Sequence, residues 1–158
     1  SRGFGTRDCR CGVAGQPRRK RRARLGCGRF QRPAPDSAAA NSSTVRVGAL
    51  RLMGASIGPR CLILPGVRVL MPWNLILEDH VAIGRGVDFY NFAPITVRRM
   101  TVISQETYLC TGSHDFRQAD MPLVYRPITI GSECWLAAGV FVCPGVTVAD
   151  GVAATGRA

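Results

Sequence analysis

The stretch "PITIGSECWLAAGVFVCPGVTV", residues 127–148, decides the fold, because its apolar residues recur every six positions. The recurring residues are Ile130, Leu136, Val142 and Val148. A period of six fits neither the 3.6-residue period of a helix nor the simple alternation of a strand. It predicts short strands joined by tight corners, with one apolar residue per strand pointing into a three-sided prism.

The same period runs through most of the chain. The residue four positions after each repeat residue is usually small or β-branched, and "PGV" at 65–67 and 144–146 supplies turn residues where corners are needed. Stacked coils of this kind pair as parallel strands about 4.8 Å apart, and each covers the apolar edge of its neighbour. We therefore predict an all-β solenoid, a parallel β-helix. The earlier repeat residues are Ile57, Ile63, Val69, Leu77, Ile83, Phe89, Val97, Ile103 and Leu109, and Ala154 follows Val148.

Three interruptions of the period carry further information. Val69 and Leu77 are eight residues apart, as are Phe89 and Val97, whereas Leu109 and Ile130 are twenty-one apart. Because three hexads make one coil, all three interruptions fall at the same corner of successive coils. The first two are small bulges, and we expect the third to be a long loop over residues 115–129.

Residues 1–44 differ in composition from the rest of the chain. They hold eleven Lys and Arg against Asp8 and Asp36, a charge of +9 of the total +11, whereas residues 45–158 carry only +2. This segment is rich in Arg, Gly, Pro, Ala and Ser without apolar periodicity, so we expect a disordered basic tail or an artefactual extension. The alternative is that the run "PRRKRRAR" at 17–24 contacts nucleic acid or an acidic membrane surface, which we do not favour.

The number and spacing of the cysteines and the lengths of the apolar runs argue against a disulfide-rich protein, a metal site and a membrane-spanning protein. The seven cysteines are an odd number, and nothing else points to secretion, so a disulfide framework is not expected. Cys9, Cys11 and Cys27 lack a nearby fourth ligand and the usual CxxC spacing, so we expect no metal. No run approaches the roughly 18 apolar residues of a membrane span. We expect a cytoplasmic protein.

Beside the opening stretch stand "PWNLILEDHVAIGRGVDFYNFAPITV", residues 72–97, and "ISQETYLCTGSHDF", residues 103–116. Together they resemble the left-handed parallel β-helix of the hexapeptide-repeat acyltransferases. Within that family the resemblance is closest to the colanic acid biosynthesis acetyltransferases and the maltose and galactoside O-acetyltransferases. It covers residues 45–158, whereas 1–44 match nothing in the family. The family's capping coil and C-terminal segment are missing, so we expect the domain to be truncated there.

His114 is the candidate catalytic residue. A sugar hydroxyl that attacks a thioester must lose its proton, and a neutral imidazole accepts one near pH 7. His114 follows Leu109 by five residues, where the chain leaves the prism. A lone histidine there is most often an exposed loop residue, but the resemblance implies a general base. The implied reaction moves an acetyl group from acetyl-CoA to a hydroxyl of a sugar or polysaccharide precursor. His80, at a regular corner, is expected to be structural or exposed.

The acceptor site is expected on the coil before His114. Asp88, Tyr90 and Asn91 lie there and can bond sugar hydroxyls, although packing and turn formation are an equal alternative for Tyr90 and Asn91. Asp115 adjoins the base and is a further candidate, either to contact substrate or to orient the imidazole. Sequence neighbours often point apart, so its role stays open.

The donor site rests on the resemblance alone. It implies that the main chain at Ala138 and Gly156 meets the pantetheine arm of coenzyme A, since small side chains let the backbone approach closely. Trp135 is expected to flank the channel, although coil packing is the commoner role of such a residue. The resemblance also implies homotrimers with each site between two prisms, and a long loop that reaches a neighbouring subunit.

Three rival interpretations remain. A zinc hydratase like the γ-type carbonic anhydrases needs three histidine ligands, and this chain has two histidines. Cys110 as an acyl-carrying nucleophile needs a base poised on it, and the family pattern gives it none. A non-catalytic solenoid scaffold, or an inactive fragment of an enzyme, is the main alternative. The sequence leaves open which sugar is the acceptor and whether the acyl group is larger than acetyl.

Overall fold

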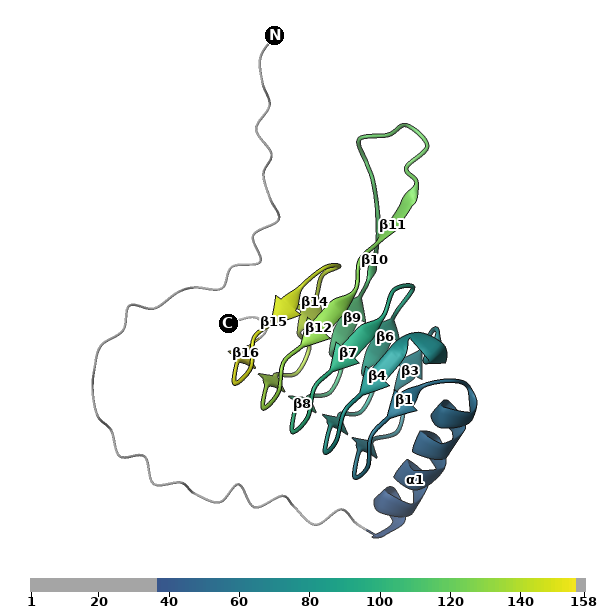
Figure 1. Cartoon of the computed structure of the whole chain (residues 1–158), viewed down its shortest axis with the longest axis vertical. Helices are drawn as coiled ribbons and strands as arrows, with labels where there is room; N and C mark the ends of the chain where they lie inside the picture. The colour runs from purple at the N-terminus through teal and green to yellow at the C-terminus, as the bar shows by residue number, and fades with distance from the viewer. Residues whose placement is uncertain (1–36, 156–158) are drawn as a thin grey trace, which may run out of the picture. The chain divides into compact units, whose positions relative to one another are not determined.

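The computed structural model describes residues 37–155, which form one helix followed by a stack of short strands wound into three-sided coils (Figure 1). The prism has three faces, named here A, B and C. Face A holds β1 (Ser56–Ile57), β4 (Leu75–Leu77), β7 (Ile95–Val97), β12 (Ile128–Ile130) and β15 (Thr147–Val148). Face B holds β2 (Leu62–Ile63), β5 (Ala82–Ile83), β8 (Val102–Ile103), β13 (Trp135–Leu136) and β16 (Ala153–Ala154). Face C holds β3 (Arg68–Val69), β6 (Asp88–Tyr90), β9 (Tyr108–Cys110) and β14 (Phe141–Val142).

The strand pairing confirms the predicted parallel β-helix. Every pair between successive coils is parallel, and the repeat residues lie opposite one another: Leu77 pairs with Val97, Val97 with Ile130, and Ile130 with Val148. Each coil therefore adds one strand to each face. The hexad period of the sequence and the coil period of the structure are the same pattern.

The repeat residues form the core, as predicted. In the middle coils their side chains are at most 1% exposed, whereas Val69, Val148 and Ala154 near the ends of the stack are partly exposed. Full burial of one such side chain contributes about 1.5–3 kcal/mol to folding, so the interior column is the main source of stability. The fully buried repeat residues are Ile63, Leu77, Ile83, Phe89, Val97, Ile103, Leu109, Ile130 and Leu136.

The corners between faces A and B are regular. In each, one residue takes a positive φ, and in the later four its amide donates to a carbonyl of the coil before. This left-handed conformation costs a non-glycine residue about 1–2 kcal/mol, which the corner's hydrogen bonds and packing offset. The corner residues are Arg60, His80, Met100, Glu133 and Gly151.

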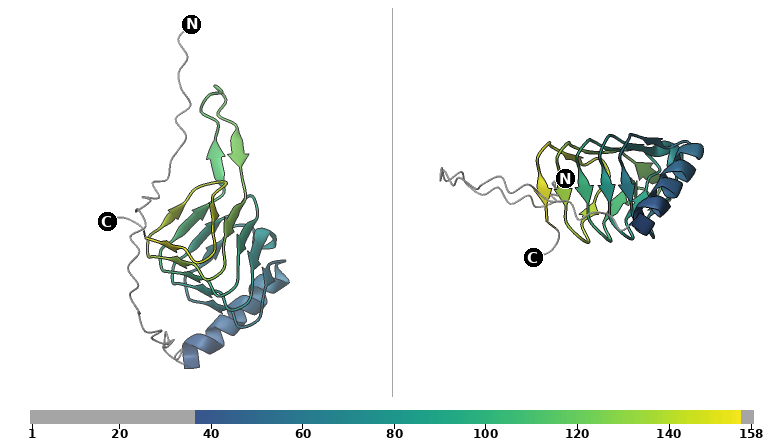
Figure 2. Two further views of the ribbon diagram at one scale, coloured as in Figure 1. Left: turned by 60° about the vertical axis from the view of Figure 1, so that its left-hand side comes forward. Right: turned by 90° about the horizontal axis from the view of Figure 1, so that it is seen from below.

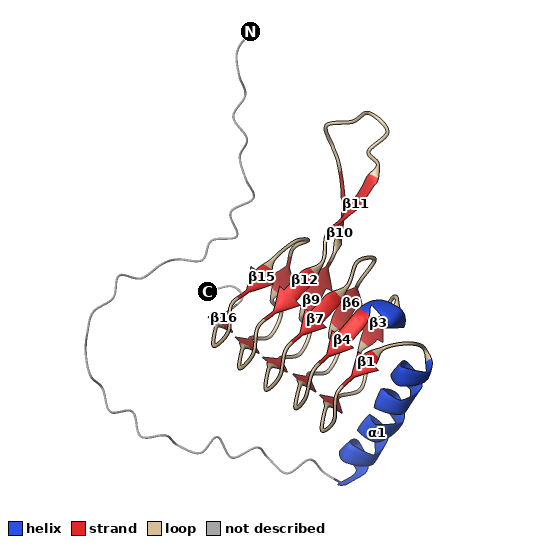
Figure 3. Cartoon of the chain, viewed as in Figure 1, coloured by secondary structure: helices blue, strands red, loops and turns tan. Residues whose placement is uncertain are grey.

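The corners between faces C and A hold the interruptions, as predicted. The first contains a 3₁₀ turn, η1 (Pro72–Asn74), the second is the short loop 91–94, and the third projects far from the coils (Figure 3). The expected excursion over 115–129 is present, and its base is an antiparallel hairpin of β10 (Gly112–His114) and β11 (Leu123–Tyr125). Pairing the two strands satisfies backbone groups that an irregular loop would leave to solvent.

A helix at the start of the described chain was not predicted. α1 (Ser37–Leu52) crosses the boundary that composition placed at residue 45 and lies across one end of the stack (Figure 2). Val47 is buried against the first coil, and the Ser43 hydroxyl accepts a hydrogen bond from Ile63 N at 2.9 Å. Residues 37–44, which composition assigned to the tail, are thus part of α1, and Ser43 contacts the first coil. The basic run at 17–24 and Cys9, Cys11 and Cys27 lie outside the described residues.

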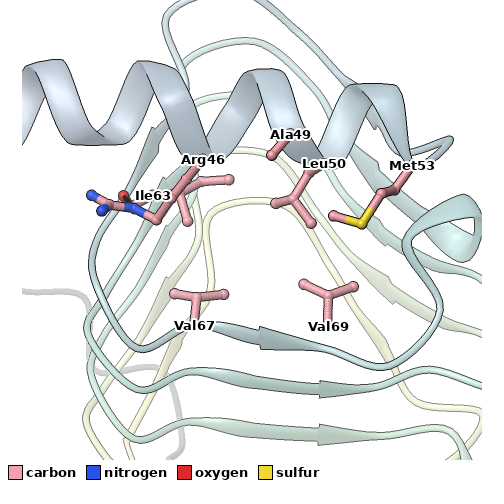
Figure 4. Close-up of a pocket in the computed structure, with 7 residues that line it drawn as sticks. All are labelled: Arg46, Ala49, Leu50, Met53, Ile63, Val67 and Val69. Atoms are coloured by element: carbon pink, nitrogen blue, oxygen red, sulfur yellow. Dashed lines mark hydrogen bonds between the residues drawn. The ribbon is translucent and has the colours of Figure 1, made fainter.

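A pocket of about 280 Å³ remains between α1 and the first coil (Figure 4). Its walls are apolar except for Arg46, whose Nε donates to Ile63 O at 2.9 Å. The pocket lies at the α1 end of the stack, whereas the hairpin leaves the third coil, so it is separate from the His114 region. Within residues 37–155, no helix combines the length and the apolar content that crossing a membrane requires.

Candidate active site

His114 ends strand β10 and carries an exposed side chain. Its ring Nδ1 lies 2.6 Å from the carbonyl oxygen of Met121, on the returning strand side of the hairpin. A carbonyl oxygen only accepts hydrogen bonds, so in the neutral ring Nδ1 carries the proton and Nε2 keeps its lone pair. The exposed imidazole is thereby held in the tautomer that can accept a proton through Nε2.

The turn of the hairpin holds the Met121 carbonyl in place. Met121 has a positive φ of 45°, and its amide donates to Gln118 O at 3.0 Å. The Asp115 carboxylate accepts from Gln118 Nε2 and from Arg117 N, both at 3.1 Å. The Gln118 amide, and then the Arg117 amide, lower the pKa of Asp115.

Asp115 therefore acts in the turn and makes no described contact with the imidazole. Its carboxylate bonds organise the segment that presents the Met121 carbonyl to His114. A role of Asp115 in contacting an acceptor stays a prediction.

The three acceptor candidates on β6 and the loop after it lie in different environments. Asp88 forms an ion pair with Arg68, with Nη2 and Oδ2 2.8 Å apart. Asn91 is fully buried, and its amide bonds both Met71 N, at 2.9 Å, and Met71 O, at 2.7 Å. Asp88 and Asn91 thus bond to residues of the preceding coil, which does not support a role in binding the acceptor. Tyr90 differs from them in presenting a half-buried aromatic ring.

Tyr90 belongs to a row of aromatic rings on the outer surface of face C. Its ring centroid lies 4.9 Å from that of Phe92 and 6.2 Å from that of Tyr108, which in turn lies 5.3 Å from Phe141. Desolvation, reinforced by Cys110, raises the pKa of Tyr108 to about 12. Tyr108 and Phe141 were not among the predicted site residues, although each directly precedes a repeat residue and so had to point outward.

The donor candidates lie on the coil after the hairpin. Ala138 is exposed at the corner between faces B and C, before Gly139, whose φ is 69°. Among the hydrogen bonds of residues 37–155, none uses the Ala138 amide. Trp135 points outward from face B, 49% exposed, with Nε1 donating to Ser104 Oγ at 2.9 Å. Gly156 lies outside the described residues.

One chain does not bring the base and the donor candidates together. β9 runs toward the corner that carries His114, and its partner β14 begins just after the corner that carries Ala138. The two corners are therefore opposite ends of face C. His114 and Ala138 of the same chain are separated by the width of that face.

Two side chains that the sequence set aside also have defined places. His80 occupies a regular corner with φ 60°. The Cys110 thiol is buried and lies 3.1 Å from Gly112 O, a carbonyl and not a base. Within residues 37–155, no three His, Cys, Asp or Glu side chains gather in a way that could hold a metal ion.

Sequence comparison places the repeat among acetyltransferases. No protein-family model matches the chain. It is 46% identical over 108 residues to a protein of Escherichia coli K12 named as a colanic acid biosynthesis acetyltransferase, WcaF, and the match covers 68% of this chain. It is 28% identical over 95 residues to nodulation protein L of Rhizobium meliloti. The chain spans 59% of the length of WcaF and 51% of that of nodulation protein L.

Solved structures share the fold. A maltose O-acetyltransferase from Clostridium difficile 630 superposes with a TM-score of 0.66 and 19% identity, over 80% of this chain and 66% of that one. A galactoside acetyltransferase in complex with coenzyme A gives 0.57 and 21%, over 79% and 62%. At these identities the likeness concerns the fold alone. Together with the hexad repeat and the similarity to WcaF, it shows that the chain belongs to the hexapeptide-repeat acetyltransferase family.

Proposed function

We propose that the protein transfers an acetyl group from acetyl-CoA to a hydroxyl of a sugar or polysaccharide precursor, with His114 as general base. The contact between His114 Nδ1 and Met121 O carries the proposal, because it leaves Nε2 unprotonated and exposed to an incoming hydroxyl. The name of WcaF and those of the maltose and galactoside enzymes support this class of acceptor. The expected cytoplasmic location stays a prediction.

The proposed reaction needs one proton acceptor that later becomes a donor. Nε2 of His114 takes the hydroxyl proton as the acceptor oxygen bonds to the thioester carbonyl carbon. Negative charge develops on the carbonyl oxygen, where a backbone amide can stabilise it. The carbon–sulfur bond then breaks, and the imidazolium returns its proton to the departing thiolate of coenzyme A. The products are the acetyl ester and free coenzyme A, and the histidine is neutral again.

The donor is proposed to lie along the corner that carries Ala138. Small residues and an uncommitted amide at this corner let an extended pantetheine arm approach the main chain. Trp135, exposed on the adjoining face, is proposed to flank the arm. Gly156, outside the described residues, stays a donor-site candidate on the resemblance alone.

We propose a homotrimer, in which a second copy completes each site. His114 and Ala138 lie at opposite ends of face C, so a neighbour's corner must face the hairpin for base and thioester to meet. The hairpin also exposes Leu123, Val124 and Tyr125 by 42%, 42% and 59%. An isolated two-stranded hairpin is marginally stable in water, which favours a partner that covers these side chains.

Replacing His114 by Ala tests the function. We expect the transfer rate from acetyl-CoA to a panel of methyl hexosides to fall by about 10²–10⁴-fold, because that is the usual contribution of a general base. Binding of coenzyme A, measured by calorimetry, should be retained. A rate close to that of the unaltered protein would refute the base assignment. An unaltered protein that binds no coenzyme A would instead be a scaffold.

A further inference from the structure

We infer that Thr111 is a positioning residue, which fixes the hairpin so that His114 stands at the reacting hydroxyl. The inference rests on the proposed function of His114. Thr111 is fully buried and lies between β9 and β10, three residues before the base. Its side chain is fully buried, out of reach of a substrate, so it would act through the hairpin.

Thr111 joins the hairpin to the preceding coil by three hydrogen bonds. Its hydroxyl donates to Tyr90 O at 3.1 Å and accepts from Ala93 N at 3.1 Å, and its own amide donates to Tyr90 O at 3.0 Å. One buried hydroxyl thus donates to the last residue of β6 and accepts from the short loop that follows it in the coil before. A hydroxyl satisfied on both sides in a buried place defines its position sharply.

The same residue closes the hairpin at its base. The Thr111 carbonyl accepts from Arg126 N at 2.9 Å, which ties the outgoing strand to the returning one. The next residue, Gly112, packs closely against two rings, since a Cβ there would lie 3.2 Å from Phe92 Cδ2 and 3.5 Å from Tyr90 Cε1. The preceding coil, strand β10 and strand β11 therefore meet at Thr111. The rings of Tyr90 and Phe92 pack against the backbone of the next residue, Gly112.

A small tilt of the hairpin at Thr111 displaces the His114 imidazole, because the ring lies well beyond the attachment. Strand residues rise about 3.3 Å each, so His114 stands roughly 10 Å beyond the attachment. A tilt of about ten degrees over that length displaces the ring by about 2 Å, and misplacement of a reacting group by 1 Å can lower a rate by about 100-fold. The contact between His114 and Met121 lies within the hairpin and cannot correct a tilt of the hairpin as a whole.

Thr101 provides an internal control. It is also fully buried, its hydroxyl donates to Gly131 O at 2.7 Å, and it accepts from Cys134 N at 3.1 Å. The two threonines thus bridge successive coils with the same pair of bonds. Thr101, however, belongs to a regular corner between faces A and B and carries no excursion.

The test compares Thr111→Val, Thr111→Ser and Thr101→Val in the full chain, with acetyl-CoA and methyl hexosides as substrates. Both valine variants should lower the melting temperature by similar amounts, because each leaves a buried amide without its acceptor. Only Thr111→Val should lower kcat, by about 10–100-fold, with the KM for acetyl-CoA within about twofold. Thr111→Ser, which keeps the hydroxyl, should recover most of kcat. Equal kcat values for the two valine variants, or a serine variant as slow as the valine one, would overturn the inference.

Two further measurements test the role of Thr111 if Thr111→Val does not fold or if the proposed function fails. If Thr111→Val does not fold, Gly112→Ala perturbs the same attachment, because the added methyl group would lie 3.2 Å from Phe92 Cδ2 and either the ring or strand β10 must give way. A kcat at least about fivefold lower supports the inference, and one within about twofold contradicts it. Nuclear Overhauser contacts between the hairpin and the short loop 91–94 then report the attachment of the hairpin without turnover. If His114→Ala leaves turnover intact, the proposed function fails, yet contacts that are lost in Thr111→Val and kept in Thr101→Val still show that Thr111 positions the hairpin.

Discussion

The corners between faces A and B and the corners between faces C and A are built by opposite means. Each A–B corner has one positive-φ residue, and all but the first bond to the coil before. The C–A corners hold a 3₁₀ turn, a short loop, a hairpin and, in the last coil, a plain turn. A corner can grow in this way because stability resides in the interior column and the strand ladders. The candidate base lies at an interruption of the repeat, on a hairpin that projects from the coils.

The largest expected effect is a difference in stability between a substitution in the coil interior and one in the hairpin. Phe89 is fully buried in the core, whereas Phe116 at the hairpin turn is 79% exposed. Phe89→Ala should lower the free energy of unfolding by about 3–5 kcal/mol, through lost burial and a cavity. Phe116→Ala should change it by less than about 0.5 kcal/mol. Urea unfolding measures both, and similar losses in the two variants would mean that the hairpin is part of the folding core.

Two methionines with positive φ, one in each kind of corner, allow the two backbones to be compared. Met100, at an A–B corner, and Met121, in the hairpin turn, have φ of 59° and 45° and are 51% and 52% exposed. Met100→Gly should raise the free energy of unfolding by up to about 1 kcal/mol, because relief of the left-handed conformation exceeds the entropic cost of glycine. Turnover should be unchanged.

The matching change in the hairpin should behave differently. Met121→Gly gives the backbone freedom to leave the conformation that aims its carbonyl at His114. We expect turnover to fall by roughly three- to tenfold, which is about 0.7–1.4 kcal/mol of lost transition-state stabilisation. Equal turnover in the two glycine variants would show that the Met121 carbonyl does not set the tautomer.

The smallest effect concerns the carboxylate that orders the hairpin turn. The Gln118 amide holds the pKa of Asp115 below its ordinary value of 3.8. Because the pKa is lower in the folded protein, the ionised Asp115 side chain contributes to stability above pH 3.8, and this stabilisation is lost as the pH falls through the lowered pKa. Gln118→Ala should raise the pKa of Asp115 toward 3.8, as followed by NMR titration of its side-chain carbon. No movement would mean that this contact is not formed in solution.

The sequence predicted some parts of the molecule better than others for identifiable reasons. Leu77, Phe89 and Leu109 were placed in the core because a six-residue period survives any detail of packing. α1 was missed because its Ala- and Ser-rich sequence has no apolar stripe, and it covers the prism with only a few side chains such as Val47. Asn91 looked like a ligand for a sugar, yet its amide is bonded to Met71, a contact between coils that no local pattern reveals.

The sequence by itself determined the solenoid, the shared corner of the three interruptions and the position of His114 early in the third. These follow from periodicity, since a repeat that buries one residue in six leaves the chain few ways to fold. Only the tertiary structure decided that the excursion is a hairpin, that the Met121 carbonyl faces the His114 ring, and that Thr111 joins the hairpin to the coil. Such contacts join residues on different strands and coils, so the directions of individual hydrogen bonds decide them and the period does not.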